Sequence, residues 1–506
     1  MRIYFTWILV ITNLLYAETW GLNILIVTLL TIVLFGWKES RLFKRNKENA
    51  DSLPENKGQW WLAALIWLTS ATAVFLNGGW FANFIYVVAF YYFTSLQQQF
   101  KISLPLGIVQ TFQSGSTGLV RFFFEYFFYQ PNSDTSDRMK KIMRQSLLFL
   151  IPVIVLIIFL KLYQMADEQF YEWTKFINLD WISWGFIASY LLLILLMYGT
   201  YFFKPHPSIL EVEKSLKNEI NPTYTDRIQD FFGENNERKL AVSLLAVLNV
   251  MLVLYLMLDI KFLTNVPFVP KPYSFYSISI HSGINALIVS LILVIFLITY
   301  LFRGALNFKK SKSIKTLAIT WIIFNCILVF TTALKNYEYV AQLGFTYKRL
   351  GVYLYLFLCL VGLSFALYKV LRALSIWFLI RNMTISFLLF FAVVSLFNWD
   401  KFITKFNLTH VNEDQLDLEY LYSLGPDSYV DLMKYHLDNK IFDTDLVYRI
   451  SNSITYEVKE LKRGFNEKSW RSYVLSDLEL YNDLKNYHFV YPDDESQSEL
   501  SVVNLR

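Results

Sequence analysis

The chain has 506 residues, of which 55% are hydrophobic, 18% aromatic and only 17% charged, and its formal net charge is +5. Its mean hydropathy is +0.37. This profile excludes an ordinary soluble domain and indicates a protein that crosses a membrane many times. Both cysteines, Cys326 and Cys359, fall in apolar runs, so neither a disulfide framework nor a CxxC metal or redox motif is expected.

Apolar runs long enough to cross a bilayer recur along the chain and predict about eleven transmembrane helices. They lie near residues 3–17, 20–37, 59–77, 80–96, 145–163, 182–203, 239–258, 280–302, 314–334, 350–370 and 377–397. Because these runs are continuously apolar, the expected fold is an all-α polytopic membrane helix bundle. The first run resembles a signal peptide, but the second follows almost at once, so we expect a retained hairpin.

The segment from about residue 104 to 128 lies between the fourth and fifth predicted spans. It is too polar to cross the bilayer at Gln110, Gln113 and Arg121, and it is too apolar for a free loop. We expect an interfacial amphipathic helix there. It packs under the bundle in the simpler interpretation, and it senses lipid or a partner in the alternative.

The distribution of Lys and Arg predicts the orientation of the chain in the membrane. With the N-terminus inside, the inner segments up to residue 400 carry 27 Lys and Arg residues and the outer segments carry 7. Retained cytoplasmic loops hold the excess of positive charge. The sequence therefore predicts a membrane protein with its N-terminus inside and its C-terminus outside.

The composition changes after the last predicted span. Residues 1–400 have 34 Lys and Arg against 22 Asp and Glu, whereas residues 401–506 have 12 against 19. We therefore divide the chain into a transmembrane domain, 1–400, and an acidic extracytoplasmic domain, 401–506. The apolar spacing in the second domain predicts about four short helices, one of which should end at Gly464. Its acidity argues against nucleic-acid binding and leaves an envelope protein as the expected partner.

Polar and ionisable residues near lipid are costly, so those at helix ends point to candidate sites. By the predicted topology most of them gather on the outer side, where the ligand-binding candidates are Glu18, Asn23, Asp259, His281, Asn285, Lys335, Arg349 and Asn398. Two simpler interpretations stay open: Asp259 pairs with Lys261 at the interface, and His281 caps its helix. His281 and Asn285 lie one helical turn apart, so both can face the same neighbour.

Motifs for known chemistry are absent from the sequence. There is no HExxH, GxSxG or Walker A motif, so no cofactor or catalytic residue is assigned. A metal site built from His410, His436 and His488 is not expected, because their spacing does not suggest that they converge.

Several segments together resemble a known family. They are "NLLYAETWGLN", "DIKF", "YSISIHSGINALI", "TYLFRGALNF", "TTALKNYEYVAQLGFTYKRLGVY", "FNWDKFITKFNL" and "LDLEYLYSLGPDSYVDLM". In this order they resemble bacterial membrane proteins of the domain-of-unknown-function 4173 type, which is DUF4153-like. The resemblance implies a polytopic membrane fold and no assigned reaction. It adds Arg303 to the polar positions named above as part of the family pattern.

Three functions follow from these features. The first is binding or transport of a small polar or lipidic ligand at an outward-facing site where Glu18, Asp259, His281, Lys335 and Arg349 converge. The second is a non-catalytic membrane scaffold or signalling component whose external tail binds a partner. The third is an integral-membrane transferase or hydrolase, with Asp259 or Glu18 as base and His281 as acid.

Overall fold

A computed structural model describes most of the chain. The described residues are 2–46, 57–97, 102–124, 148, 152, 155–156, 159–160, 162–174, 183–220, 233–265, 289–303, 305–308, 312–439, 444–467, 469–485, 487–490 and 501–504. They fold into two compact units. One comprises Met1–Ala17 and Thr111–Pro205, and the other comprises Glu18–Gln110 and His206–Arg506.

The first unit is built around α1 (Arg2–Leu15) and α8 (Trp184–Tyr201), which pack against each other. It also contains α7 (Glu168–Thr174) and the second half of α5 (Leu104–Phe123). The helix α5 crosses α8 where Ser114 and Gly118 lie against Gly199, and the Ser114 hydroxyl donates to the Gly199 carbonyl at 2.9 Å. A side chain at Gly199 would overlap the Ser114 carbonyl, so the crossing depends on small residues.

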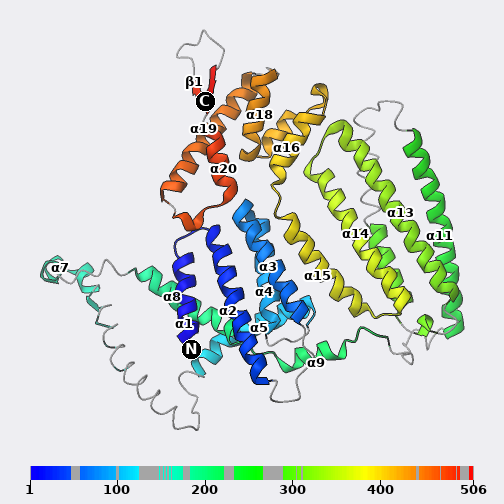
Figure 1. Ribbon diagram of the computed structural model, residues 1–506, viewed down its shortest axis with the longest axis horizontal. Coiled ribbons are helices and arrows are strands. Elements are labelled where there is room, and N and C mark those ends of the chain that lie inside the picture. Colours follow the sequence, from blue (N-terminus) through cyan, green and yellow to red (C-terminus); the bar gives the residue numbers. More distant parts are fainter. Residues whose placement is uncertain are drawn as a thin grey trace. The chain divides into compact units, whose positions relative to one another are not determined.

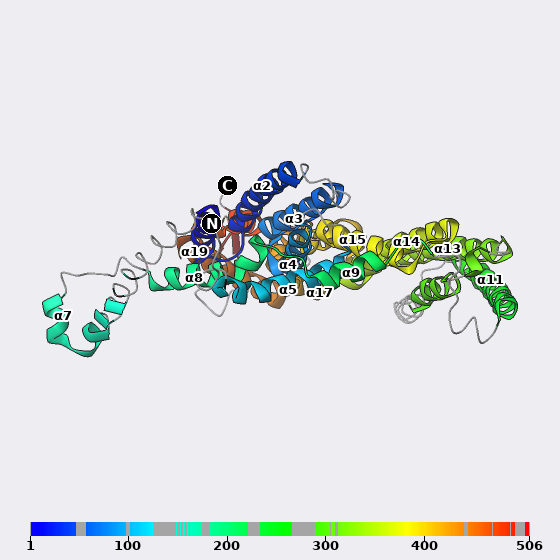
Figure 2. The ribbon, with the colours of Figure 1, turned by 90° about the horizontal axis from the view of Figure 1, so that it is seen from below.

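The second unit contains a row of long apolar helices. Its members are α2 (Leu22–Asn46), α3 (Lys57–Asn77), α4 (Gly79–Ser95), α15 (Ile376–Val394), α14 (Tyr347–Arg372), α13 (Lys312–Leu343) and α11 (Glu234–Asn265). In that order α2 packs on α3, α3 on α4 and α15, α15 on α14, α14 on α13, and α13 on α11 (Figure 1). Figure 2 shows α15, α14, α13 and α11 following one another in this row.

Five helices of the described residues are long and apolar enough to cross a membrane: Gly58–Asn77, Asn235–Lys261, Lys312–Leu343, Tyr347–Arg372 and Ile376–Val394. Shorter apolar helices span Arg2–Leu15, Leu22–Lys38, Gly185–Tyr201 and Val289–Leu301. Each coincides with a predicted span, and α4 coincides with the predicted span 80–96. Most of the predicted span 145–163 lies outside the described residues.

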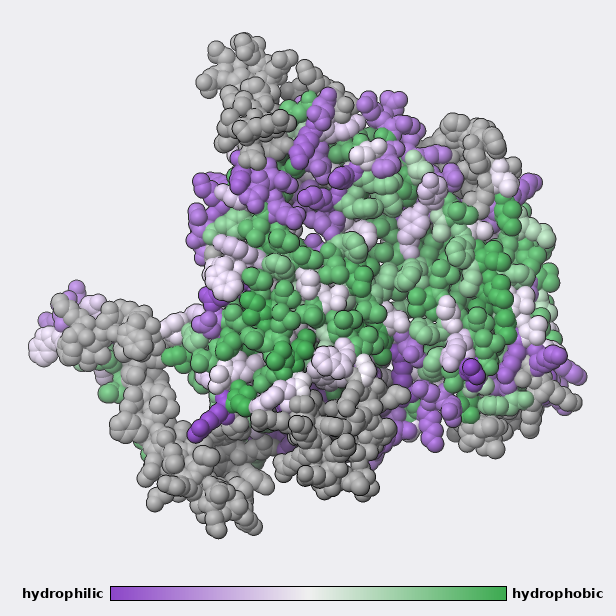
Figure 3. Space-filling model, viewed as in Figure 1, coloured by the Kyte–Doolittle hydropathy of each residue, from purple (hydrophilic) through white to green (hydrophobic). Residues whose placement is uncertain are grey.

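The surface of these helices is apolar. Figure 3 shows hydrophobic residues over α11, α13 and α14 and hydrophilic residues over the C-terminal helices. On α11 the exposed residues include Val247, Val250, Leu254 and Leu258. Large apolar side chains in a continuous exposed band are what lipid-facing helices present. The chain is therefore a largely helical protein whose described residues include five helices long and apolar enough to span a membrane.

The C-terminal residues form a cluster of shorter helices. These are α16 (Trp399–His410), α17 (Leu418–Ser423), α18 (Pro426–Asn439), α19 (Thr444–Glu467) and α20 (Leu475–Leu484), with 3-10 turns η5 (Glu413–Gln415) and η6 (Trp470–Ser472). Their apolar core includes Ile403, Leu432 and Ile450 and also takes in Leu350 of α14. Gly464 does not end its helix as predicted, because α19 continues to Glu467.

Three smaller elements complete the second unit. The helix α9 (Pro207–Ser215) and the 3-10 turn η4 (Ala305–Asn307) lie between the long helices in the sequence. A short antiparallel pair, β1 (Tyr487–Val490) and β2 (Ser501–Asn504), follows α20 with Tyr487 opposite Asn504.

The segment predicted to lie at the interface, 104–128, forms a helix as far as Phe123, and residues 125–128 fall outside the described part.

Candidate functional site

Glu18 lies in the loop between α1 and α2 and contacts residues near the end of the chain. Its carboxylate accepts hydrogen bonds from the Ser469 hydroxyl at 2.6 Å, from the Arg471 guanidinium at 2.8 Å and from the Ser472 hydroxyl. Burial raises the pKa of Glu18, but these donors and the charge of Arg471 outweigh it and hold the pKa below its usual value. Glu18 is therefore an ionised anchor for the C-terminal helices.

The backbone beside Glu18 fits the same C-terminal segment closely. The Leu22 amide donates to the Tyr473 carbonyl at 3.0 Å. A Cβ atom on Gly21 would lie 2.6 Å from that carbonyl oxygen, so only glycine permits the approach. Asn23 is fully buried and ties the loop together, because its side chain accepts from the Gly21 amide and donates to the Thr19 carbonyl, both at 2.9 Å.

Asp259 and Lys335 form an ion pair between α11 and α13. The second carboxylate oxygen of Asp259 accepts a hydrogen bond from Thr331 at 2.9 Å, and Asp259 is only 3% exposed. The Lys335 ammonium also lies 6.0 Å from the Tyr255 ring centroid. Both members of this pair lie inside helices that are long and apolar enough to cross a membrane, Asn235–Lys261 and Lys312–Leu343.

Arg349 stabilises the turn between α13 and α14. Its guanidinium donates to the carbonyls of Leu343 at 2.7 Å and Gly344 at 2.5 Å, and it lies over the Tyr339 ring at 4.0 Å from the centroid. Since its charge covers the last carbonyls of α13, Arg349 acts as a helix C-cap. On the same turn, the Asn407 side chain of α16 bonds both the amide and the carbonyl of Phe345, at 2.6 and 2.9 Å.

Asn398 belongs to a polar junction between α14 and the C-terminal helices. Its side chain caps α16 at the Lys401 amide, at 3.1 Å, and donates to Asp427 at 3.0 Å. The neighbouring Asp400 accepts a hydrogen bond from the Tyr347 hydroxyl at 2.7 Å. The junction thus holds two carboxyl groups close to each other where α14, α16 and α18 meet.

Both carboxyl groups of this junction have raised pKa values. For Asp400, burial and the charge of Asp427 raise the pKa, and the Tyr347 hydroxyl only partly offsets them. For Asp427, burial and the charge of Glu479 raise the pKa against the opposing effects of Asn398 and Lys401. Burial with like-charged neighbours favours the protonated form of a carboxyl group. A rise in pH that ionises both carboxyl groups should therefore destabilise this junction.

The predicted outer site is thus divided among separate contacts. Asp259 and Lys335 meet, but Glu18 precedes α2, at the other end of the helix row from α11, and its partners come from the C-terminal helices. Arg349 and Asn398 serve two further contacts. His281 and Asn285 lie outside the described residues. Arg303, the additional family-pattern residue, pairs with Glu237 of α11 at 3.0 Å.

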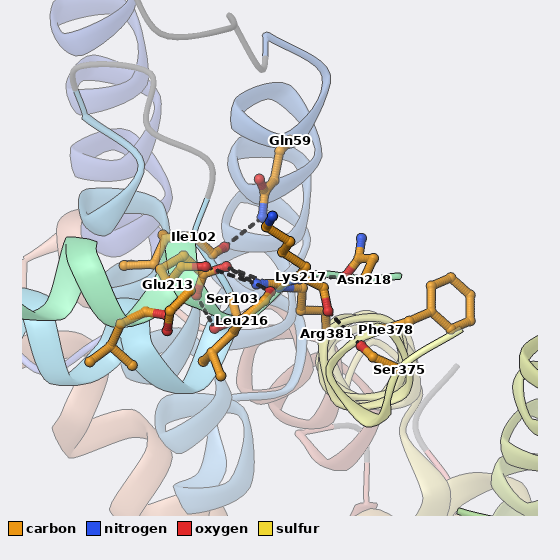
Figure 4. A network of polar contacts seen from close by, with 12 residues as sticks. Gln59, Ile102, Ser103, Glu213, Leu216, Lys217, Asn218, Ser375, Phe378 and Arg381 are labelled. Carbon is orange, nitrogen blue, oxygen red and sulfur yellow. Dashed lines mark hydrogen bonds and ion pairs between the residues drawn. The ribbon is translucent and has the colours of Figure 1, made fainter. Parts of the chain in front are cut away.

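A second buried polar cluster joins α3, α9, α15 and the start of α5, and we call it the inner node. Arg381 of α15 donates to the Glu213 carboxylate at 2.9 Å, to the Leu216 carbonyl at 2.6 Å and to the Asn218 side chain. The other Glu213 oxygen accepts from the Ser103 hydroxyl at 2.7 Å. Figure 4 shows the Arg381 guanidinium pointing toward these acceptors at the end of α9.

The inner node extends to α3 and α4 and to the α14–α15 turn. The Gln59 side chain donates to the Tyr92 hydroxyl and to the Ile102 carbonyl, both at 2.7 Å. The Ser375 amide and hydroxyl donate to the carbonyls of Asn218 and Lys217, at 2.8 and 2.7 Å. Arg381, Ser103 and Ser375 therefore hold residues 213–218 through bonds to Glu213, Leu216, Lys217 and Asn218.

The inner node is not among the sites predicted from the sequence. Arg381 lies inside the predicted span 377–397, and an arginine within an apolar run is itself a signal of a buried polar site. It was counted only as one of the positive charges that indicate orientation. Glu213 gave no signal of its own, because a single acidic residue on a short amphipathic helix is usually solvated.

Comparison with known proteins identifies a family but no relative of known activity. The profile of the family described as "Domain of unknown function (DUF4153)" matches residues 60–435. No curated protein and no solved structure matches the chain. Among the described residues, no group of three or more His, Cys, Asp or Glu side chains is arranged to hold a metal ion.

Proposed function

Because the chain belongs to the DUF4153 family, whose description assigns no activity, we propose a function from its own geometry: the protein binds or transports a small charged ligand at Asp259 and Lys335. The pair offers an anion and a cation side by side, with Thr331 and Tyr255 as neighbours. A zwitterion or an ion with a polar head group would exchange with this pair most readily.

The observation that supports the proposal is the position of the pair. Asp259 is nearly inaccessible, and both residues lie in helices with the length and composition of membrane spans. Burying two charges there is expensive, and ionisable residues within spans commonly mark ligand or ion pathways. A purely stabilising role would be served as well by two apolar residues of similar volume.

The proposed topology has about eleven transmembrane helices in a bacterial inner membrane, with the N-terminus inside and the C-terminus outside. It is supported by the described apolar helices and by the excess of Lys and Arg on one set of loops. Under this topology Asp259 and Lys335 lie nearer the outer ends of α11 and α13. The acidic helices after residue 400 then lie outside the cell.

The test uses the full-length protein in lipid nanodiscs. Its thermal unfolding is measured with a panel of amino acids, amines and phosphorylated alcohols, in the wild type and in D259N/K335M. We expect at least one compound to raise the Tm of the wild type and to lose that effect in the double variant. An equal response of both proteins to every stabilising compound would place the binding site elsewhere.

A second candidate function is a membrane scaffold that presents its C-terminal helices to an envelope protein. The observation that favours it is the attachment of these helices to the bundle through Glu18, Asn407 and Leu350. Domains that move independently seldom share an apolar core with their anchor. Crosslinking in cells that recovers no partner, together with full function after removal of residues 401–506, would count against this candidate.

The third function considered, an integral-membrane transferase or hydrolase, stays a prediction. It requires His281 beside Asp259 or Glu18, and His281 is outside the described residues. The Glu18 carboxylate is taken up by three donors from residues 469–472, and both oxygens of Asp259 have donors as well. Either carboxylate would have to exchange these partners before it could act as a base.

A further inference from the structure

We propose that the exposed face of α16 lies in the headgroup region of the lipid bilayer, so that this helix is a membrane-surface helix and not part of a water-exposed domain. The inference is independent of the proposed ligand site, because it concerns a different surface. It moves the membrane boundary past residue 400, where the sequence placed the start of the soluble domain.

The face consists of a continuous row of aromatic rings, which we call the aromatic row: Phe397, Trp399, Phe402, Phe406 and His410. Successive ring centroids lie 5.4, 5.9, 6.2 and 4.4 Å apart along the row. Phe397 is 56% exposed and Phe402 is 45% exposed, whereas Trp399 and Phe406 are half-buried and Phe345 packs against Phe402 and Phe406. Apolar rings at this spacing on one side of a helix would lose favourable burial if they faced water.

A neighbouring face of α16 is already buried by protein. Ile403, Thr404 and Asn407 are at most 5% exposed, α16 packs against α18, and Asn407 is bonded to the α13–α14 turn. The helix therefore has two apolar faces. One packs in the protein core, and the other is the aromatic row. A third, polar side of the helix carries Lys401 and Lys405, and the Lys401 ammonium lies 3.9 Å from the carboxylates of both Glu479 and Asp483.

The start of the aromatic row is held at the end of a membrane-spanning helix. The helix α15 ends at Val394, and the Trp399 indole nitrogen donates to the Val394 carbonyl at 3.0 Å. The Asn77 side chain donates to the Ser395 carbonyl at 2.9 Å, which brings the α3–α4 turn alongside. Trp80, near the beginning of α4, is 80% exposed. Large exposed rings therefore surround the end of α15.

Trp favours the headgroup region, because its ring is shielded from water there while its indole N–H is not, and Phe is common on the apolar face of helices that lie in this region. A helix that lies in this region buries its apolar face at the boundary between headgroups and acyl chains. Lys405 is exposed beside the aromatic row, one helical turn after Phe402, and a lysine can extend its ammonium to lipid phosphates while its methylenes stay near the rings. The lipid surface thus fits both the rings and the charge.

The test compares two single-cysteine variants in a C326A/C359A background, F402C in the aromatic row and Y456C on α19. Tyr456 is a suitable control because it is 65% exposed and lies in the same group of C-terminal helices. Each cysteine carries an environment-sensitive fluorophore, and the full-length protein is placed in phosphatidylcholine nanodiscs. Quenching is measured with aqueous iodide and with phosphatidylcholine brominated near the headgroup end of its acyl chains.

We expect the ratio of lipid quenching to iodide quenching to be roughly tenfold higher at position 402 than at 456, because a probe at headgroup depth meets the bromines and is shielded from water. K405C should behave like F402C and serves if the first variant does not fold. Iodide quenching at 402 equal to that at 456 would overturn the proposal. Quenching at 402 by neither agent would also overturn it, since protein would then cover the row.

Discussion

The Arg471 guanidinium donates to the Glu18 carboxylate at 2.8 Å, although the two residues are 453 positions apart in the sequence. The hydroxyls of Ser469 and Ser472 also donate hydrogen bonds to this carboxylate. The loop before the second helix is therefore an attachment point for the end of the C-terminal helices. Their position over α2 and α3 does not depend on the covalent connection from α15 alone.

Replacing Glu18 by Ala should weaken this attachment. The loss of charged hydrogen bonds, with Arg471 left partly buried, should cost about 1–3 kcal/mol of unfolding free energy. Limited proteolysis of the C-terminal helices and thermal unfolding measure the effect. Glu419→Ala is the matched control, because its ion pair with Arg449 is on the surface and its removal should change little. Equal effects of both substitutions would show that Glu18 is not an anchor.

The junction at Asp400 and Asp427 should make stability depend on pH. A carboxyl group whose pKa is raised by folding contributes stability below its unfolded pKa, about 3.9 for Asp, and loses it as the pH rises through the folded value. Asp400→Asn removes one negative charge and keeps an acceptor for Tyr347. It should raise the Tm near neutral pH, and the gain should shrink as the pH falls toward about 4. A Tm lowered equally across this pH range would contradict the expectation.

Glu18 should respond to pH in the opposite direction. Its pKa is lowered by its partners, so its stabilisation is present above the unfolded Glu pKa of about 4.3 and is lost as the pH falls through the folded value. Glu18→Gln should therefore be less stable than the wild type at neutral pH and approach it in acid. Thermal unfolding of the two proteins across pH gives this difference, and a constant difference at all pH values would refute the assignment.

Arg381 should be irreplaceable by lysine at the inner node. Its guanidinium reaches Glu213, Leu216 and Asn218 at once, and an ammonium cannot reproduce this planar set of donors. Arg381→Ala should cost about 3–5 kcal/mol, as expected when one partner of a buried ion pair is removed. Arg381→Lys should recover only part of it. Arg372→Lys, at the exposed end of α14, is the control; a fully stable Arg381→Lys would contradict the argument.

The crossing of α5 and α8 offers a prediction in the first unit. Gly199→Ala places a methyl group against the Ser114 carbonyl and should cost about 1–3 kcal/mol through overpacking. Gly115→Ala on α5 is its control, because a Cβ atom there meets no neighbour within 4 Å and alanine favours a helix. Thermal unfolding compares the two. Similar stability of the two variants would show that the helices separate easily at this point.

The sequence predicted the helices well because a membrane span is a local property of composition. The apolar runs that end near residues 77 and 370 appear as helices that end at Asn77 and Arg372, whereas the helix over the run 314–334 continues to Leu343. Which polar side chains bond to each other is not a local property of the sequence. Nothing in the spacing around Glu18 points to Arg471. The sequence around Arg381 likewise does not indicate its partner, because Glu213 lies on another helix, so Arg381 contributes to the prediction only as an orientation charge. Asp259 was weighed against the nearby Lys261, but its partner is Lys335.

We propose that Asp259 and Lys335 bind the ligand and do not merely stabilise the fold. In a strain lacking the protein, complementation should be compared for the wild type, Asp259→Asn, Lys335→Met and the double variant, with membrane abundance measured for each. The single variants should lose abundance, because each removes one partner of a largely buried ion pair. We predict that the double variant reaches wild-type abundance and still fails to complement. Complementation by the double variant at wild-type abundance would contradict the claim.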